Sequence, residues 1–442
     1  MREMKDSGIS WFDYIPKDWK AGRIKDIISL LSDYTANGSF SDLAKNVEYH
    51  DFEDYARLVR LTDLRENLSN DGVYVDEYAY NYLAKSSLIG GEILVANVGA
   101  YAGLFCEMPK VNYPATLAPN MFMIRTNINM LQHYLFYVGN ATFIWEQLSQ
   151  KAISSAQPKL NKTDVKTAYL PIPTIEEQQK ISDYLDIRCS EIDSLTADIQ
   201  KQIEILEEHK KSLIFRVISK GISYNTLKKT TSDIWKEIPE TWKLSDIKYI
   251  FEIVKRIAGK EGFDVLSVTQ KGLKVKDITN MEGQLAENYS GYQFVYPTDY
   301  VMNHMDLLTG WVDCSTMFGV TSPDYRVFRL RDKTNNDLTY FKYVMQCCYM
   351  NKVFYSLGQG VSNLGRWRLQ TSSFNNFMIP VPPLENQQQI AEYLNQKFSE
   401  IDSIIADKRK QIETLEEYKN SIIFEYVTGK KEVNDYDKET NE

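Results

Sequence analysis

The chain has 442 residues, a quarter of them charged, and a net charge of −9 at pH 7. That length favours two or more domains, and the negative charge argues against a surface that binds nucleic acid everywhere, although local basic faces remain compatible with it. No apolar run reaches the ~18 residues of a membrane span, no leader-like segment is present, and the five cysteines show no C-x-x-C pair, so we expect a cytoplasmic protein with buried thiols, no membrane partner and no zinc site.

The first predicted domain covers residues 1–168. It opens with YIPKDWKAGRIKDI, which begins at Tyr14 and contains Trp19. Short runs that alternate apolar and polar residues predict strands over 91–103 and 120–126, and a longer apolar stretch predicts a helix over 130–148. Strands and helices mixed in this way indicate an α+β domain.

A long helix is predicted within residues 169–222. It follows the proline-rich LPIPTIEEQQ at Leu170, and Gly221 fits a C-terminal stop. Apolar residues spaced by three and four predict a packing stripe, which consists of Ile192, Leu195, Ile199, Ile203 and Leu206. Some forty helical residues extend roughly 60 Å, which is more than the lid of a small core requires.

Residues 223–378 repeat the pattern as a linker, an opening segment and a second domain. EIPETWKLSDIKYI, which contains Trp242, matches the first opening segment. Strands are predicted over 264–269 and 324–330 and a helix over 338–357. This second domain is also expected to be α+β, although the two domains share little sequence.

The second long helix is predicted within residues 379–431, before an acidic tail over 432–442 that we expect to be disordered. Residues 379–428 align without a gap with residues 170–219, and roughly half of the positions are identical, so the chain contains an internal duplication. The second stripe consists of Ile401, Ile404, Ile405, Ile412 and Leu415. Two such stripes predict an antiparallel, coiled-coil-like pair that separates the two domains with pseudo-two-fold symmetry; the alternative is two independent helices, each packed on its own domain.

Motifs for catalysis are absent from the sequence. There is no phosphate-binding G-x-x-x-x-G-K-[ST], no dinucleotide-binding G-x-G-x-x-G, and no [ND]-P-P-[YF] of an amino-methyltransferase. The four histidines show no metal-ligand spacing. We therefore expect no catalytic residues, no metal site and no cofactor on this chain.

Polar loops in both domains instead suggest DNA recognition, because amide and guanidinium groups hydrogen-bond base edges and hydroxyl and basic groups bind phosphates. An ordinary polar loop is as good an explanation for any one of these residues. The candidates are Asn97, Tyr101, Gln157 and Lys159 in the first domain, and Asn303, His304, Asp306, Thr309, Gln359, Ser362, Asn363, Arg366 and Arg368 in the second.

The duplicated PIPTIEEQQKISDYLD at Pro171 and PVPPLENQQQIAEYLN at Pro380, each after a variable domain and before a long helix, resemble the specificity subunit (HsdS) of type I restriction–modification systems. The resemblance covers essentially the whole chain. It implies that each variable domain is a target recognition domain for one half of a split double-stranded DNA sequence, and that the helices set the gap and hold two methyltransferase subunits. The helix positions expected to bind these partners are Gln178, Ile181, Tyr184, Leu185, Gln387, Ile390, Tyr393 and Leu394.

The resemblance further implies that a motor/nuclease restriction subunit joins the complex, and that S-adenosylmethionine, ATP and magnesium bind to the partner subunits. A coiled-coil adaptor whose globular domains bind proteins is the alternative from another class, and it would show no salt-sensitive DNA binding. An enzyme with an active site in one domain is a third interpretation, and a titratable cluster in a deep pocket would favour it.

Overall fold

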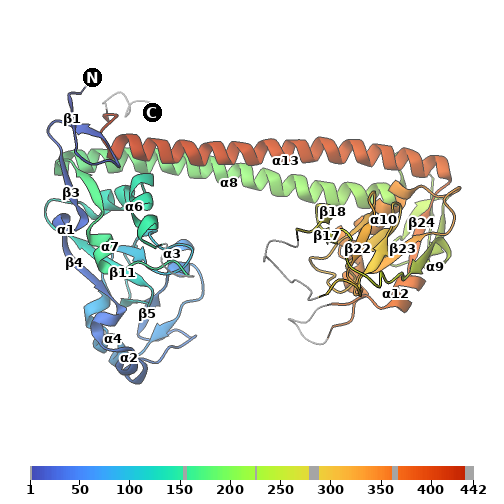
Figure 1. Cartoon of the computed structure of the whole chain (residues 1–442), viewed down its shortest axis with the longest axis horizontal. Coiled ribbons are helices and arrows are strands. Elements are labelled where there is room, and N and C mark those ends of the chain that lie inside the picture. Colours follow the sequence, from blue (N-terminus) through green and yellow to red (C-terminus); the bar gives the residue numbers. More distant parts are fainter. Residues whose placement is uncertain (1, 153–156, 224–225, 278–287, 361–366, 434–442) are drawn as a thin grey trace. The chain divides into compact units, whose positions relative to one another are not determined.

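The computed structural model describes residues 2–152, 157–223, 226–277, 288–360 and 367–433. It divides into two compact units, Met1–Asp198 with Lys410–Glu442, and Ile199–Arg409. Both boundaries fall inside the long helices, α8 (Ile175–Lys220) and α13 (Leu384–Val427), so each unit contains one globular domain and one part of each helix. Figure 1 labels the elements. Most of the tail expected over 432–442 lies outside the described residues.

The first unit contains two four-stranded sheets. One is antiparallel in the order β4 (Ile28–Asp33), β11 (Met121–Thr126), β8 (Ile93–Ala96) and β9 (Phe105–Glu107). The other has the order β6 (Tyr74–Val75), β5 (Ala56–Val59), β10 (Ala115–Leu117) and β7 (Ser87–Leu88), with β5 and β10 parallel. Two-stranded pairs join β1 (Met4–Asp6) to β2 (Tyr14–Pro16) and β3 (Lys20–Arg23) to β12 (Tyr169–Ile172).

Short helices connect these strands. They are α1 (Ile24–Ile27), α2 (Phe40–Asn46), α3 (Leu61–Arg65), α4 (Glu77–Tyr82), α5 (Gln132–Gly139), α6 (Thr142–Ala152) and α7 (Lys162–Lys166), with 3-10 turns at Tyr34–Asn37 and Ala84–Ser86. The strand expected over 120–126 is confirmed as β11, whereas the run over 91–103 forms β8 and then a loop.

The prediction of a single helix over 130–148 is wrong. The chain forms two helices there, α5 and α6, with a break at Asn140. The Asn140 side chain binds the edge of β9: its Nδ2 donates to the Phe105 carbonyl at 2.9 Å and its Oδ1 accepts from the Phe105 amide at 3.2 Å. A side chain at Gly139 would lie 2.3 Å from the Phe105 ring. The break therefore lets the two helices pack closely against the strand.

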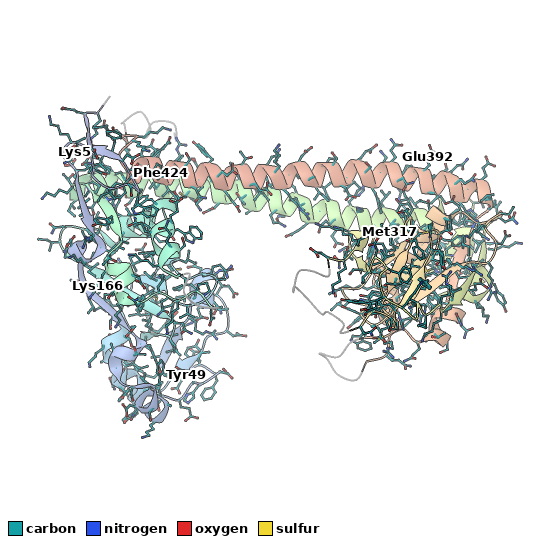
Figure 2. The ribbon with its side chains drawn as sticks, viewed as in Figure 1. Lys5, Tyr49, Lys166, Met317, Glu392 and Phe424 are labelled. Carbon is teal, nitrogen blue, oxygen red and sulfur yellow. The ribbon has the colours of Figure 1, made fainter. Side chains whose placement is uncertain are left out.

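The core of the first unit joins the domain to both long helices. Buried residues of the opening segment, of α5 and α6, of the start of α8 and of the end of α13 form one cluster, which includes Trp19, Tyr134, Leu185 and Val427. Near the end of α13, Phe424 (labelled in Figure 2) contacts Phe143 with ring centroids 6.1 Å apart. The helices are thus part of this core rather than attached to its surface.

The second unit repeats the same sheet with different residues. Its antiparallel sheet has the order β16 (Phe251–Val254), β23 (Arg326–Leu330), β20 (Tyr300–Met302) and β21 (Val312–Cys314). Two-stranded pairs are β13 (Leu227–Lys229) with β14 (Glu237–Pro239), β15 (Lys243–Asp246) with β24 (Met378–Val381), β17 (Leu266–Thr269) with β18 (Gly272–Val275), and β19 (Gln293–Val295) with β22 (Gly319–Thr321). The α+β expectation is confirmed, and the strands expected over 264–269 and 324–330 correspond to β17 and β23.

The helices of the second unit's domain are α9 (Ile247–Ile250), α10 (Leu338–Met350), α11 (Val353–Ser356) and α12 (Thr371–Asn376). The helix expected over 338–357 is also divided, between α10 and α11. Lys352 has a φ of 54° there, a left-handed conformation that a continuous α-helix does not allow.

The two long helices are α8 (Ile175–Lys220) and α13 (Leu384–Val427). In the first unit the Lys419 ammonium lies 2.6 Å from the Asp193 carboxylate, and in the second unit Lys210 lies 2.6 Å from Asp402. Higher numbers on α8 face lower numbers on α13, so the helices are antiparallel within each unit. The two ion pairs occupy equivalent positions of the duplication.

The packing stripe follows the prediction at most positions. Ile192, Ile401 and Ile405 are buried, and Ile199, Leu206, Ile412 and Leu415 are half-buried. The prediction is wrong at Leu195 and Ile404, whose side chains are 52% and 45% exposed. The buried face continues from Ile192 through Ile199 to Ile203 on α8 and from Ile401 to Ile405 on α13. Across the part of the chain that the structure describes, no helix combines the length and apolar character needed to cross a membrane.

Candidate nucleic-acid interface

In the first unit, the loop after β8 packs against residues 157–160. The amide of Leu160 donates to the carbonyl of Asn97 at 2.8 Å, and the amide of Gly99 donates to the carbonyl of Pro158 at 2.9 Å. Gly99 has a φ of 90°, so the turn depends on a glycine there. The structure therefore brings together two polar segments that lie about sixty residues apart in the sequence.

All four candidates of the first domain lie at this junction. Tyr101, Gln157 and Lys159 are exposed, and Tyr101 is 47% accessible. Asn97 is half-buried, and its Oδ1 is buried without a hydrogen-bond partner among the described residues. A polar group held in this way costs free energy unless a further donor reaches it.

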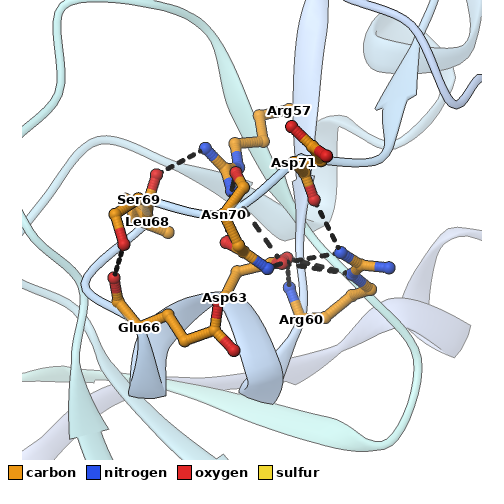
Figure 3. Close-up of polar contacts among 8 residues, drawn as sticks. All are labelled: Arg57, Arg60, Asp63, Glu66, Leu68, Ser69, Asn70 and Asp71. Atoms are coloured by element: carbon orange, nitrogen blue, oxygen red, sulfur yellow. Dashed lines mark hydrogen bonds and ion pairs between the residues drawn. The ribbon is translucent and has the colours of Figure 1, made fainter. Parts of the chain in front are cut away.

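A third segment of this surface was missed in the sequence. The guanidinium carbon of Arg65, at the end of α3, lies 4.4 Å from the centroid of the Tyr101 ring. Figure 3 shows the polar contacts that hold α3 and the chain after it, centred on the buried Asp63. Nothing in the local sequence pairs Arg65 with Tyr101, so only the fold reveals the contact.

The second unit builds the equivalent junction from the loop after β20 and residues 367–369. The amide of Leu369 donates to the carbonyl of His304 at 2.9 Å, and the amide of Leu307 donates to the carbonyl of Trp367 at 3.2 Å. Gln359 and Arg368 are exposed, and their backbones form an antiparallel bridge. The remaining candidates of this segment, Ser362, Asn363 and Arg366, lie outside the described residues.

Three candidates of the β20 loop have local structural partners. The Asp306 carboxylate accepts from the amides of Leu308 and Thr309 at 3.0 and 2.9 Å and also binds the Thr309 hydroxyl. The Asn303 side chain accepts from the amide of Met305 at 3.3 Å. These side chains shape the loop, which is the ordinary role of Asp, Asn and Thr in turns.

The same junction contains a buried arginine. Arg326, at the start of β23, is 4% exposed, and its Nη2 donates to the Leu369 carbonyl at 3.0 Å. Burial lowers the pKa of Arg326 to about 10, and burial together with Arg326 and Arg368 lowers the pKa of His304 to about 4. His304 is therefore neutral at pH 7, and positive charge in this junction comes from the two arginines. The sequence indicated only a strand at Arg326.

The starts of the long helices face their own domains. Six of the eight positions expected to bind partner subunits are buried, so that expectation is corrected for Gln178, Ile181, Leu185, Gln387, Ile390 and Leu394. The other two, Tyr184 and Tyr393, are half-buried. The prediction stands for these two tyrosines, and any other contact of a partner with the helix starts must use side chains outside the six that are buried.

The two buried glutamines make the same contacts in each unit. Gln178 accepts from the amide of Leu131 at 2.7 Å and donates to the carbonyl of Asn129 at 2.9 Å. Gln387 accepts from the amide of Asp337 at 2.8 Å and donates to the carbonyl of Asn335 at 3.5 Å. Each glutamine thus fixes the segment before a domain helix, α5 or α10, to the start of a long helix.

The side-chain contacts between the domain helix, α5 or α10, and the long helix differ between the units. In the first, His133 lies between the carboxylates of Glu107 and Asp186, at 2.5 and 2.8 Å, and the Tyr137 hydroxyl donates to Asp186 at 2.5 Å. In the second, the Tyr343 hydroxyl binds Asn395 at 2.6 Å. Hydrogen bonding to Glu107, assisted by Asp186 and opposed by burial, raises the pKa of His133 to about 9.

For metal or cofactor chemistry, we find no cluster of three or more His, Cys, Asp or Glu side chains within the described ranges that could hold an ion. The arrangement of both junctions instead offers amides, guanidinium groups and lysines on loops fixed by a sheet. Such groups can hydrogen-bond base edges and phosphates.

Comparison with known proteins gives one consistent result. The family model for the type I restriction modification DNA specificity domain matches residues 16–205 and again residues 239–414. Two specificity subunits of type I restriction enzymes from Methanocaldococcus jannaschii, MjaX and MjaVIII, are 25% and 26% identical over 94% of this chain, and cover 94% and 93% of their own lengths.

One solved structure has a similar fold. It comes from work on complex assembly and conformational transition of the type I R-M system, and it aligns with a TM-score of 0.64 at 15% identity, over 93% of this chain and 98% of that chain.

Proposed function

The chain belongs to the type I restriction–modification DNA specificity family and serves in DNA recognition, and from this premise we propose how its two units divide the task. Each unit recognises one half of a bipartite double-stranded target through its junction of loops. The chain itself is a non-catalytic subunit.

The observation that carries this proposal is that both units contain the same junction of two loops, lined by different side chains. In both units the loop after the third strand of the antiparallel sheet, β8 or β20, is hydrogen-bonded to the segment before Leu160 or Leu369. Asn97, Tyr101 and Lys159 line the first junction, whereas His304, Arg326 and Arg368 line the second. The same frame with different hydrogen-bonding groups suits two half-sites of different sequence.

The long helices set the gap between the half-sites and bind two methyltransferase subunits. The fixed gap is supported by the continuity of α8 over Ile175–Lys220 and of α13 over Leu384–Val427. The binding of two identical partners is supported by the duplicated ion pairs, which mark two equivalent faces on the helices. We expect S-adenosylmethionine on the methyltransferase subunits, ATP and magnesium on motor/nuclease subunits, and a cytoplasmic complex.

A map of methylated adenine tests the proposal. Cells that express this chain with the methyltransferase encoded beside it should show a new motif of two short half-sites with a fixed unspecified gap. Cells that lack only this chain should not show it. If the chain and the methyltransferase associate but no motif appears, and purified complex shows no salt-sensitive DNA binding, the proposal fails and the adaptor interpretation replaces it.

A further inference from the structure

The third segment of the first junction is α3, and its position follows from the sheet. The helix begins directly after β5, and β5 is paired with β10. Arg65 ends the helix and covers the Tyr101 ring, which belongs to the loop that Asn97 begins. The equivalent place in the second unit is the turn between β17 and β18, where the Gln270 side chain donates to the carbonyl of Thr309 in the loop after β20, at 3.4 Å.

Arg65 is an exposed cation on an exposed ring. Its side chain forms no ion pair with any described residue, and Tyr101 is 47% accessible. A guanidinium that stacks on an aromatic ring uses its flat face and keeps its N–H groups at the edge. Those donors remain available to a ligand that lies over the junction.

Contacts inside the domain hold the backbone that carries Arg65. Asp63 is fully buried and accepts from the Arg60 amide at 2.8 Å, the Arg60 Nη2 at 2.7 Å and the Asn70 Nδ2 at 2.8 Å. Arg57 donates to the Leu68 carbonyl at 2.9 Å (Figure 3). Arg57 and Arg60 thus bind Asp63, Asn70 or backbone carbonyls. Of the three arginines, Arg65 is the one that stacks on Tyr101 at the junction.

We propose that Arg65 is a specificity-determining residue, which donates from its guanidinium edge to a base in the first half-site. The inference rests on the proposed function and adds the residue that no loop motif indicated. Bidentate hydrogen bonding to O6 and N7 of guanine is the commonest specific contact of arginine with DNA. A guanidinium held on one side by an aromatic ring and carried by a fixed helix has the positional restraint that base recognition requires, whereas a phosphate contact would not need it.

The test compares variants in the complete methyltransferase complex. Arg65→Ala should reduce the preference for one base pair of the first half-site on the order of ten- to a hundredfold, measured by methylation of a library with every base at each position. Arg65→Lys should fail to restore the preference, because an ammonium cannot make the same paired contact. Tyr101→Ala should act in the same direction, because it removes the ring on which the guanidinium stacks.

Two controls separate the outcomes. Lys45→Ala removes an exposed cation of the same unit on α2 and should leave the motif unchanged, and the second half-site serves as an internal control in every variant. If Arg65→Ala leaves the motif intact but lowers the slope of log K against log salt by roughly 0.9, Arg65 binds a phosphate and the proposal is wrong. An unchanged motif with an unchanged slope also overturns it, while absence of any motif for the unaltered chain defeats the proposed function instead.

Discussion

His133 connects three parts of the first unit through its charge. Its ring bridges Glu107 of β9 and Asp186 of α8, and the pKa of about 9 keeps it protonated at neutral pH. The folded-state pKa lies above the ordinary value of 6.5, so protonated His133 stabilises the fold fully below about pH 6.5. This stabilisation is lost as the pH rises through 9.

The expected result is a pH-dependent difference between the wild-type protein and His133→Gln. The difference in thermal unfolding midpoint should be greatest below pH 6.5 and should vanish above about pH 9, because the neutral ring no longer attracts the carboxylates. Asn395→Ala is the matched control in the second unit, since its partner Tyr343 has a pKa raised to about 12 by burial and stays neutral over this range. A difference that is constant from pH 6 to pH 10 would show that His133 acts through packing alone.

At the scale of elements, the joints between domains and long helices depend on Gln178 and Gln387. Both side chains are buried and hydrogen-bonded to backbone groups of the segments before α5 and α10. Their loss would leave half-buried amides such as that of Leu131 without this acceptor.

Gln178→Ala and Gln387→Ala should each destabilise the protein by about 1–3 kcal/mol, because a buried polar group without a partner costs that much. Urea unfolding of each variant, followed at equilibrium, measures the effect. Gln179→Ala changes the exposed neighbour of Gln178 and should have almost none. Equal effects of Gln178→Ala and Gln179→Ala would contradict a role for the buried hydrogen bonds.

Elements with a strong period could be predicted from the sequence, and those decided by tertiary contacts could not. The long helices follow from their three-and-four spacing, which Ile192, Ile401 and Ile405 confirm. The break at Asn140 depends on β9, and the stack of Arg65 on Tyr101 depends on α3 lying beside the β8 loop. At the helix starts, Gln178 has the sequence of a surface position, and its burial follows from contacts with Asn129 and Leu131.

At the scale of the whole molecule, α8 and α13 each pass from one unit into the other, at Asp198 and at Lys410. The proposed role of the helices makes their length a property of the DNA target. Seven residues add roughly 10 Å to an α-helix and keep the packing stripe in phase.

A heptad inserted after Asp198 and a second before Lys410 should therefore lengthen the gap by roughly three base pairs and leave both half-sites unchanged. The methylated motif of the doubly extended chain gives the answer directly. A heptad in only one helix should break the ion pair of Lys419 with Asp193 or that of Lys210 with Asp402, and should abolish DNA methylation by the complex. An active double variant with the original gap would disprove the role of the helices as a spacer.

The buried glutamines have a consequence for how such a protein can evolve. Gln178 and Gln387 hold their domains through main-chain amides and carbonyls, which every amino acid except proline supplies. Substitutions in the loops proposed to recognise DNA leave these hydrogen bonds intact, so new target sequences can arise without redesign of these contacts. The glutamine contacts would therefore also form with a foreign domain, provided that it keeps the side chains, such as Phe143, that pack against the long helices. Recombination between genes that share these contact residues would then create new specificities in one step.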